Sequence, residues 1–296
     1  MPRRLVTLLG LMIALAATAA CNKTSDSPAA PSQPPGPGTT VYYTAIGASD
    51  ASGVGSSVPC APFVTDCPNG MGYVPVIVRQ LQAQGATVTL SNLGIPATVI
   101  GPDFQALGAQ YGRTIPGNFI DQEAPFVPRN STIVTIFAGG NDVNTVVAAV
   151  GGGAGGSNIP AYVDQQIRAF GTDYAALLKI IRDRAPSARI IVANLPNFAG
   201  IPMTAGYTLD RRQLMQKVSV GFDTQVVNPL ASQGIAVVDL LCNPRFSDPS
   251  IFSSDGFHPN DTGYAILASE MMRAIATNGF PAPSSSCSQM QIVPPI

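Results

Sequence analysis

The sequence has no tryptophan, a single histidine and few charged residues, and each shortage argues against a class of function. Charged residues make up 11% of the 296 positions and the net charge is −1, so there is no basic surplus to bind nucleic acid. One histidine and no paired Cys-x-x-Cys spacing offer no tetrahedral metal site. With 7% aromatic residues and no tryptophan, no platform for stacking sugars is evident. Apolar residues make up 46%, which is enough for a sizeable core in one large domain or two small ones.

The N-terminus has the pattern of an export signal. Arg3 and Arg4 precede an apolar run over residues 5–20, which is short for a membrane span. The ending "AATAAC" resembles a bacterial lipobox, although Thr18 stands where leucine is usual. Residues 1–20 are therefore expected to be a signal peptide, with Cys21 as the lipid anchor of an outer-membrane or cell-surface protein. The alternative is ordinary cleavage after "ATA", which gives a periplasmic or secreted protein.

The next segment, residues 22–40, is rich in proline and serine and has no apolar periodicity. Such a segment cannot form a core, so residues 21–40 are expected to be a semi-extended tether between the anchor and the rest of the chain. Residues 41–280 form the expected domain, and residues 281–296 an irregular C-terminal tail. The glycine-rich run at residues 151–156 is expected to be a flexible insertion.

Four further cysteines are expected to form disulfides, because the chain carries an export signal. Cys60, Cys67, Cys242 and Cys287 allow three pairings. Closeness in sequence favours Cys60–Cys67, which leaves Cys242–Cys287 to hold the tail. Free buried thiols are the alternative.

Short β-branched runs alternate with helical patterns, and the runs are apolar on both faces. This order predicts an α/β fold with three layers, in which helices cover both faces of a five-stranded, mainly parallel sheet. The expected strands are residues 41–46, 87–92, 132–138, 189–195 and 235–240, and the expected helices are residues 74–84, 162–184, 211–231 and 260–278.

The only histidine lies in the stretch "SSDGFHPNDTGY", residues 253–264. Neutral imidazole is a general base, and Asp255 lies three residues before His258, close enough to orient the ring within a tight turn. Gly256 permits that turn, and Pro259 disfavours its direct continuation into a helix. The alternative is an ordinary histidine without a titrating role.

The nucleophile that such a base needs is sought where strands end, because open parallel sheets bind ligands at the carboxyl ends of their strands. Ser49 follows the first strand in "AIGASDASGVG", and Asn141 follows the third in "FAGGNDV". Each has an alternative interpretation, Ser49 as a turn residue and Asn141 as a turn residue or helix cap. Together with "SNLGIPAT" after the second strand, they supply a nucleophile, an amide donor, backbone N–H groups, a base and an acid, which is a complete set for acyl transfer.

In this order and spacing, "GASD", "NLGIPA", "GGND" and "DGFHPN" resemble the four sequence blocks of the SGNH/GDSL hydrolase superfamily, over nearly all of residues 41–278. The resemblance implies a flavodoxin-like three-layer fold. Two departures stand out. The serine block usually reads Gly-Asp-Ser, whereas here Ala48 precedes Ser49 and Asp50 follows it. Ala97 stands where the family usually has glycine.

The resemblance implies a serine esterase with Ser49, His258 and Asp255 as its catalytic triad. The oxyanion donors are expected to be the N–H groups of Ser49 and Ala97 and the amide of Asn141. Supporting positions are Gly94, an alternative donor, and Gly140. No cofactor or metal is implied, and the protein is expected to act as a monomer on a small acyl ester or on an acylated glycan or lipid. The alternatives are an acetyl esterase acting on polysaccharide and a catalytically silent surface lipoprotein of the same fold.

Overall fold

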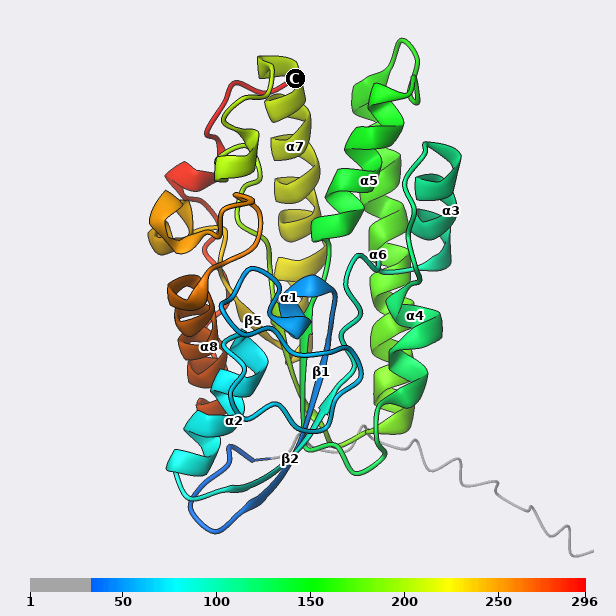
Figure 1. The fold of residues 1–296 in the computed structure, drawn as a ribbon. Helices are drawn as coiled ribbons and strands as arrows, with labels where there is room; N and C mark the ends of the chain where they lie inside the picture. The colour runs from blue at the N-terminus through cyan, green and yellow to red at the C-terminus, as the bar shows by residue number, and fades with distance from the viewer. Residues whose placement is uncertain (1–32) are drawn as a thin grey trace, which may run out of the picture.

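Five parallel strands form the sheet of the computed structural model, which describes residues 33–296, in the order β2-β1-β3-β4-β5 (Figure 1). This confirms the predicted α/β architecture. The central strands β3 and β4 are buried at every position, because helices cover both of their faces. The strands are β1 (Thr40–Gly47), β2 (Thr87–Asn92), β3 (Ile133–Phe137), β4 (Arg189–Ala193) and β5 (Ala236–Val238).

The α-helices lie in two layers, one on each face of the sheet. On one face α2 and α8 pack against each other, and on the other α6 packs beside α5 and α7 (Figure 1). The helices are α1 (Ser49–Ser52), α2 (Tyr73–Ala83), α3 (Pro102–Gln110), α4 (Phe119–Gln122), α5 (Gly140–Gly151), α6 (Ile159–Arg184), α7 (Leu209–Phe222) and α8 (Asp261–Ala276).

Two expectations about the helices need correction in detail. Residues 152–156 of the glycine-rich run form turns, but Gly151 is the last residue of α5. The run does not follow β3 directly, because "NDVNTVVAAV" forms three turns of helix that pack between α3 and α7. The helix expected at residues 211–231 is α-helical only to Phe222, and continues as a π turn and a 3₁₀ turn. Pro229 lies in that last turn, where a residue without an N–H cannot continue α-helical bonding.

Both expected disulfides are present, Cys60–Cys67 and Cys242–Cys287. Such bonds are typical of proteins that fold in an oxidising compartment outside the cytoplasm. Cys287 anchors the C-terminal tail, and Gln216 of α7 holds it further along. The side-chain oxygen of Gln216 accepts the N–H groups of Ile292 and Val293. The tail has little regular structure, and it is packed against α7.

The expected signal peptide, Cys21 and residues 22–32 of the expected tether lie outside the described residues. Residues 33–39 are described, and they lie against the domain instead of leading away from it. Gly38 donates its N–H to the carbonyl of Gly85 at 2.9 Å, and Asn278 bonds the Gln33 side chain at 3.2 Å. Within residues 33–296, no helix combines the length and the apolar character needed to cross a bilayer.

Candidate active site

Ser49 lies at the carboxyl end of β1, where it begins the single turn of α1. Its side chain is buried, with 6% of the residue exposed. The first residues of a helix have no intrahelical acceptor for their N–H groups, and within residues 33–296 the backbone N–H of Ser49 has no hydrogen-bond partner. Gly53 ends the turn with φ of +74°, in the left-handed region that favours glycine. The short turn therefore presents both a hydroxyl and a backbone donor at the edge of the sheet.

His258 contacts Ser49 although 209 residues separate them. Its Nε2 lies 2.8 Å from the Ser49 hydroxyl oxygen, and its Nδ1 lies 2.6 Å from Oδ2 of Asp255. The histidine ring is mostly buried, with 15% of its side chain exposed, and the ring of Phe257 packs edge-on against it. A hydroxyl, an imidazole and a carboxylate thus form one continuous hydrogen-bonded chain.

The turn that holds Asp255 stabilises its charged form. The second carboxylate oxygen accepts the N–H groups of Phe257 and His258 and the hydroxyl of Ser253, at 2.8 to 2.9 Å. Partial burial raises the pKa of Asp255, but hydrogen bonds, with that from His258 the strongest, outweigh this and lower the pKa to about 2. Asp255 is therefore ionised at neutral pH and able to orient the imidazole.

Gly256 is required by the same turn. Its φ is +69°, and a Cβ atom there would lie 2.6 Å from the backbone nitrogen of Met203. The backbones of Gly256 and Met203 lie this close because Met203 donates its N–H to the Gly256 carbonyl at 3.0 Å. A larger residue would push the Asp255–His258 turn away from the segment that supports it.

Ala97 lies in the loop after β2 and has φ of +68°, in the left-handed region that favours glycine. The residue is exposed, and its N–H has no hydrogen-bond partner among the described residues. Gly94, the alternative donor, is already engaged, because its N–H donates to the side-chain oxygen of Asn92 at 3.1 Å. Gly94 serves close packing instead, since a Cβ atom there would lie 2.6 Å from that of Ala51.

Asn141 and Asp142, at the start of α5, both hold the loop that carries Ala97. The Asn141 amide donates one N–H to the carbonyl of Thr98 at 2.9 Å, and Asp142 accepts the N–H of Ile100 at 3.0 Å. The capping residue of α5 is Gly139, so the interpretation of Asn141 as a helix cap is wrong. One amide proton of Asn141 remains available, because the side chain has two.

Burial raises the pKa of Asp142 to about 7, against the opposing effect of the Ile100 hydrogen bond. Asp173 of α6 raises it further, and Arg113 lowers it. Only one carboxylate oxygen of Asp142 has a partner, and the other is buried without one. Asp142 therefore holds the loop from a buried position in which the charged carboxylate is unfavourable and the protonated form is favoured.

Two acidic residues of the site had no assigned role from the sequence. Glu123 is buried between the end of β1 and the Ala97 loop, accepting the Gly47 N–H at 3.0 Å and the Thr98 hydroxyl at 3.3 Å. Burial raises its pKa well above the ordinary range, although these bonds oppose the rise. Burial also raises the pKa of Asp50, and the nearby His258 offsets part of that. Asp50 was visible in the serine block, whereas "DQEAPF" around Glu123 carries no motif.

A small cavity of about 30 Å³ lies next to the serine block. Asp50, Gly140, Phe198 and Phe257 are among the residues that line it. Gly140, at the first position of α5, faces the rings of Phe198 and Phe257, which would lie 3.4 to 3.6 Å from a Cβ atom there. Apart from Asp50, the residues that line this small cavity are apolar.

Several solved structures have a similar fold. An extracellular lipase from Streptomyces rimosus aligns with a TM-score of 0.54 and 17% identity, covering 80% of this chain and 100% of that chain. A lipase from a goat rumen metagenome gives 0.53 and 17%, covering 81% and 99%. A catalytic mutant of an acetylxylan esterase from Geobacillus stearothermophilus gives 0.50 and 18%, covering 84% and 100%. At 17 to 18% identity, these similarities show a shared fold and do not by themselves show a shared function.

No curated protein matches the sequence. The family profile described as "GDSL-like Lipase/Acylhydrolase family" matches residues 45–266, which is about three quarters of the chain. The match includes the end of β1, the other four strands, and Ser49, Asp255 and His258. The protein thus belongs to the GDSL-like lipase/acylhydrolase family, and it is a carboxylic ester hydrolase.

Proposed function

We propose that the protein is a serine esterase that acts through a Ser49–His258–Asp255 triad and an acyl-enzyme. The observation that carries this proposal is the pair of hydrogen bonds, 2.8 Å from Ser49 to His258 and 2.6 Å from His258 to Asp255. Serine is a weak nucleophile at neutral pH, and a hydrogen-bonded base is what activates it. The ionised Asp255 keeps Nδ1 protonated, so that Nε2 faces the hydroxyl as an acceptor.

In the first half of the reaction, the Ser49 oxygen bonds to the ester carbonyl carbon while its proton moves to Nε2 of His258. The carbon–oxygen bond to the alcohol then breaks, and the departing oxygen takes that proton from Nε2. In the second half, water gives a proton to Nε2 and its oxygen attacks the acyl-enzyme. The carboxylic acid leaves, and the Ser49 oxygen recovers the proton from Nε2.

The negative charge on the carbonyl oxygen needs donors fixed in advance, because reorganising them during the reaction would cost free energy. We assign this role to the unpaired N–H groups of Ser49 and Ala97 and to the second amide proton of Asn141. Glu123 and Asp142 support these donors by holding Gly47 and the Ala97 loop. All of these groups come from one chain, so the proposed active form is a monomer.

Hydrolysis of p-nitrophenyl acetate by the purified protein tests the proposal. Ser49→Ala should abolish both turnover and the initial burst of p-nitrophenol. Ser254→Ala is the matched control, because Ser254 is exposed beside the same turn. A burst that persists without the Ser49 hydroxyl means that the nucleophile lies elsewhere. Absence of turnover in the wild type, on this and other esters, would favour the catalytically silent binding protein.

The base can be assigned directly, because His258 is the only histidine. Its imidazole gives a single set of ring signals in NMR spectra. Activity should rise with pH along the same curve as the deprotonation of that imidazole, since only the neutral ring accepts the serine proton. A rate profile that does not follow the NMR titration removes His258 from this role.

The favoured substrates are simple acyl esters, given the absence of tryptophan and the scarcity of aromatic residues. Acetylated polysaccharide is the second candidate, because one similarly folded protein is an acetylxylan esterase. Comparing acetate release from acetylated xylan with hydrolysis of p-nitrophenyl acetate separates the two.

We also propose that Cys21 is lipidated and anchors the protein to a membrane. Cys21→Ser should then move it to the soluble fraction, and lipid labelling that persists in this variant contradicts the anchor.

A further inference from the structure

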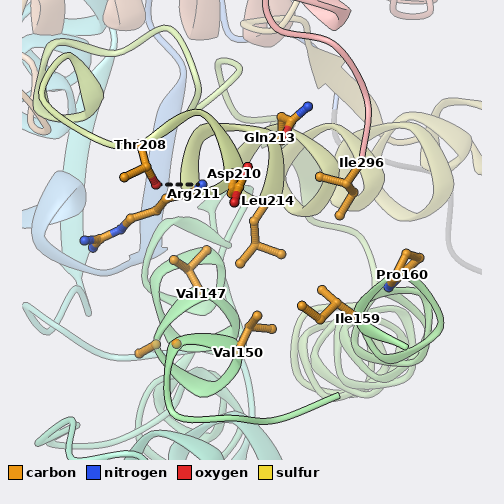
Figure 2. Close-up of a pocket in the computed structure, with 12 residues that line it drawn as sticks. Val147, Val150, Ile159, Pro160, Thr208, Asp210, Arg211, Gln213, Leu214 and Ile296 are labelled. Carbon is orange, nitrogen blue, oxygen red and sulfur yellow. Dashed lines mark hydrogen bonds between the residues drawn. The ribbon is translucent and has the colours of Figure 1, made fainter. Parts of the chain in front are cut away.

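A second, much larger cavity of about 600 Å³ lies between α5, α6, α7 and the C-terminal tail. Figure 2 shows aliphatic side chains that line it from the three helices and from the tail. They are Val147 and Val150 of α5, Ile159 of α6, Leu214 of α7 and Ile296 of the tail. The volume lies in the range of small-molecule sites, and the lining fits an aliphatic chain.

The polar residues at the rim of this cavity do not suit an anionic ligand. Arg211 is the only basic residue among those that line it, and its guanidinium lies over the ring of Tyr207, 3.7 Å from the centroid. Figure 2 shows that side chain directed away from the aliphatic groups, while Asp210 stands beside Leu214. A free fatty acid would meet a carboxylate and no facing cation, whereas the chain of a neutral ester would meet no like charge.

The cavity lies along the same face of α5 as the proposed active site. Gly140, Asn144, Val147 and Gly151 follow one another at spacings of four, three and four residues, which places them in one stripe on a helix. Gly140 lines the small cavity together with Phe257, whose ring packs against His258, and Val147 and Gly151 line the large one. At 1.5 Å per residue, about 16 Å separates the two ends of the stripe. Asn144 between them is only partly buried, so the stripe is not sealed.

The geometry of the proposed reaction selects which part of an ester would follow this stripe. In the proposed reaction, the carbonyl oxygen would face Ala97 and Asn141, and the departing alcohol oxygen would face His258. The acyl substituent is then the group that we assign to the stripe along α5. We propose that the large cavity is the binding site for the aliphatic acyl chain of the substrate. Medium- and long-chain acyl esters are then the preferred substrates. This inference rests on the proposed serine esterase activity.

The ratio of kcat/KM for p-nitrophenyl decanoate to that for p-nitrophenyl acetate tests the inference. The ratio cancels any loss of folded enzyme, which would affect both substrates equally. Ala148→Phe fills the cavity and Val150→Asp places a charge in it. Each should lower the ratio about tenfold or more, the loss expected when two methylene groups remain in water. Ala176→Phe, the same change on the exposed face of α6, should leave the ratio unchanged.

Several outcomes would overturn the assignment while leaving the serine esterase intact. One is a wild type that hydrolyses the acetate but not the decanoate. Another is an unchanged ratio in both cavity variants. A third is that the cavity variants lose activity only toward esters with a long alcohol group, seen as a lower kcat/KM for decyl acetate relative to ethyl acetate. Sedimentation equilibrium covers the remaining case, because a wild-type dimer that Ala148→Phe dissociates would make the cavity an interface between two copies. Failure of the esterase itself is seen separately, as acetate turnover that survives Ser49→Ala.

Discussion

The carboxyl group of Glu123 accepts the backbone N–H of Gly47 at 3.0 Å, two residues before the proposed nucleophile. Its other oxygen accepts the hydroxyl of Thr98, the residue after Ala97. Glu123 is completely buried. Through these two bonds its side chain joins the end of β1, which precedes Ser49, to the loop that carries Ala97. The arrangement gives Glu123 a positioning role that involves no contact with substrate.

Glu123→Ala should lower kcat by about 10- to 100-fold with little change in KM, because the two donors lose their fixed separation. Glu123→Gln should recover most of kcat, since its amide oxygen can still accept the Gly47 N–H. Steady-state kinetics on p-nitrophenyl acetate measure both effects. A glutamine variant as slow as the alanine variant would mean that the carboxyl proton, and not the geometry, is what the site requires.

Asn141→Ala should lower kcat by about 10²–10³, because the charge that the amide is proposed to meet forms only in the transition state. The lost bond to Thr98 should cost only about 1 kcal/mol of unfolding free energy. Asn141→Asp keeps the size of the side chain but replaces the donors with a carboxylate, and it should be at least as slow. Wild-type kcat in either variant, with a lowered melting temperature, would make Asn141 a structural residue of the Ala97 loop.

Asp142 should make stability depend on pH. Its folded-state pKa of about 7 lies above the value of about 3.9 for an unfolded chain, so the folded protein binds the proton more tightly. Its contribution is fully present below pH about 4, and is lost as pH rises from about 4 to about 7. Asp142→Asn retains an acceptor for the Ile100 N–H and removes this loss.

Relative to the wild type, the Asp142→Asn variant should therefore gain unfolding free energy as pH rises, on the order of 2–4 kcal/mol between pH 4 and 8. Urea unfolding at several pH values measures the difference. Asp183→Asn, at an exposed ion pair with Lys179, is the matched control and should show no such trend. A difference that is flat across this window means that the Asp142 carboxyl titrates normally.

The two disulfides should differ in their effect on stability. Cys242 and Cys287 close a loop with a sequence separation of 45, whereas Cys60 and Cys67 are separated by 7. In the chain-entropy estimate, replacing the long-loop pair by serines costs about 4 kcal/mol and replacing the short-loop pair about 2 kcal/mol. Urea unfolding of the two double-serine variants gives both numbers. The reverse order would show that the tail contributes little to the folded state.

The sequence alone was enough where a structural role depends on near neighbours. Asp255 and His258 share one tight turn, so their contact could be expected from a spacing of three residues and a glycine between them. Alternating β-branched runs and helical patterns gave the parallel sheet, because periodicity reports directly which faces are buried. The same regularity placed Ser49 and Asn141 at strand ends on one edge. Proximity in sequence also predicted the Cys60–Cys67 disulfide, which left Cys242 to pair with Cys287.

Only the tertiary structure decided the roles of residues whose partners are distant in sequence. Glu123 has no motif, and its function arises because β1 and the loop after β2 approach the same buried point. Gln216 binds a tail 76 residues further along, and the aliphatic cavity is assembled from three helices and that tail. Gly94 was expected as an alternative oxyanion donor, but in the folded chain its N–H donates to the side chain of Asn92. Hydrogen bonding and packing act through space, so a local pattern reveals them only where the chain folds back on itself within a few residues.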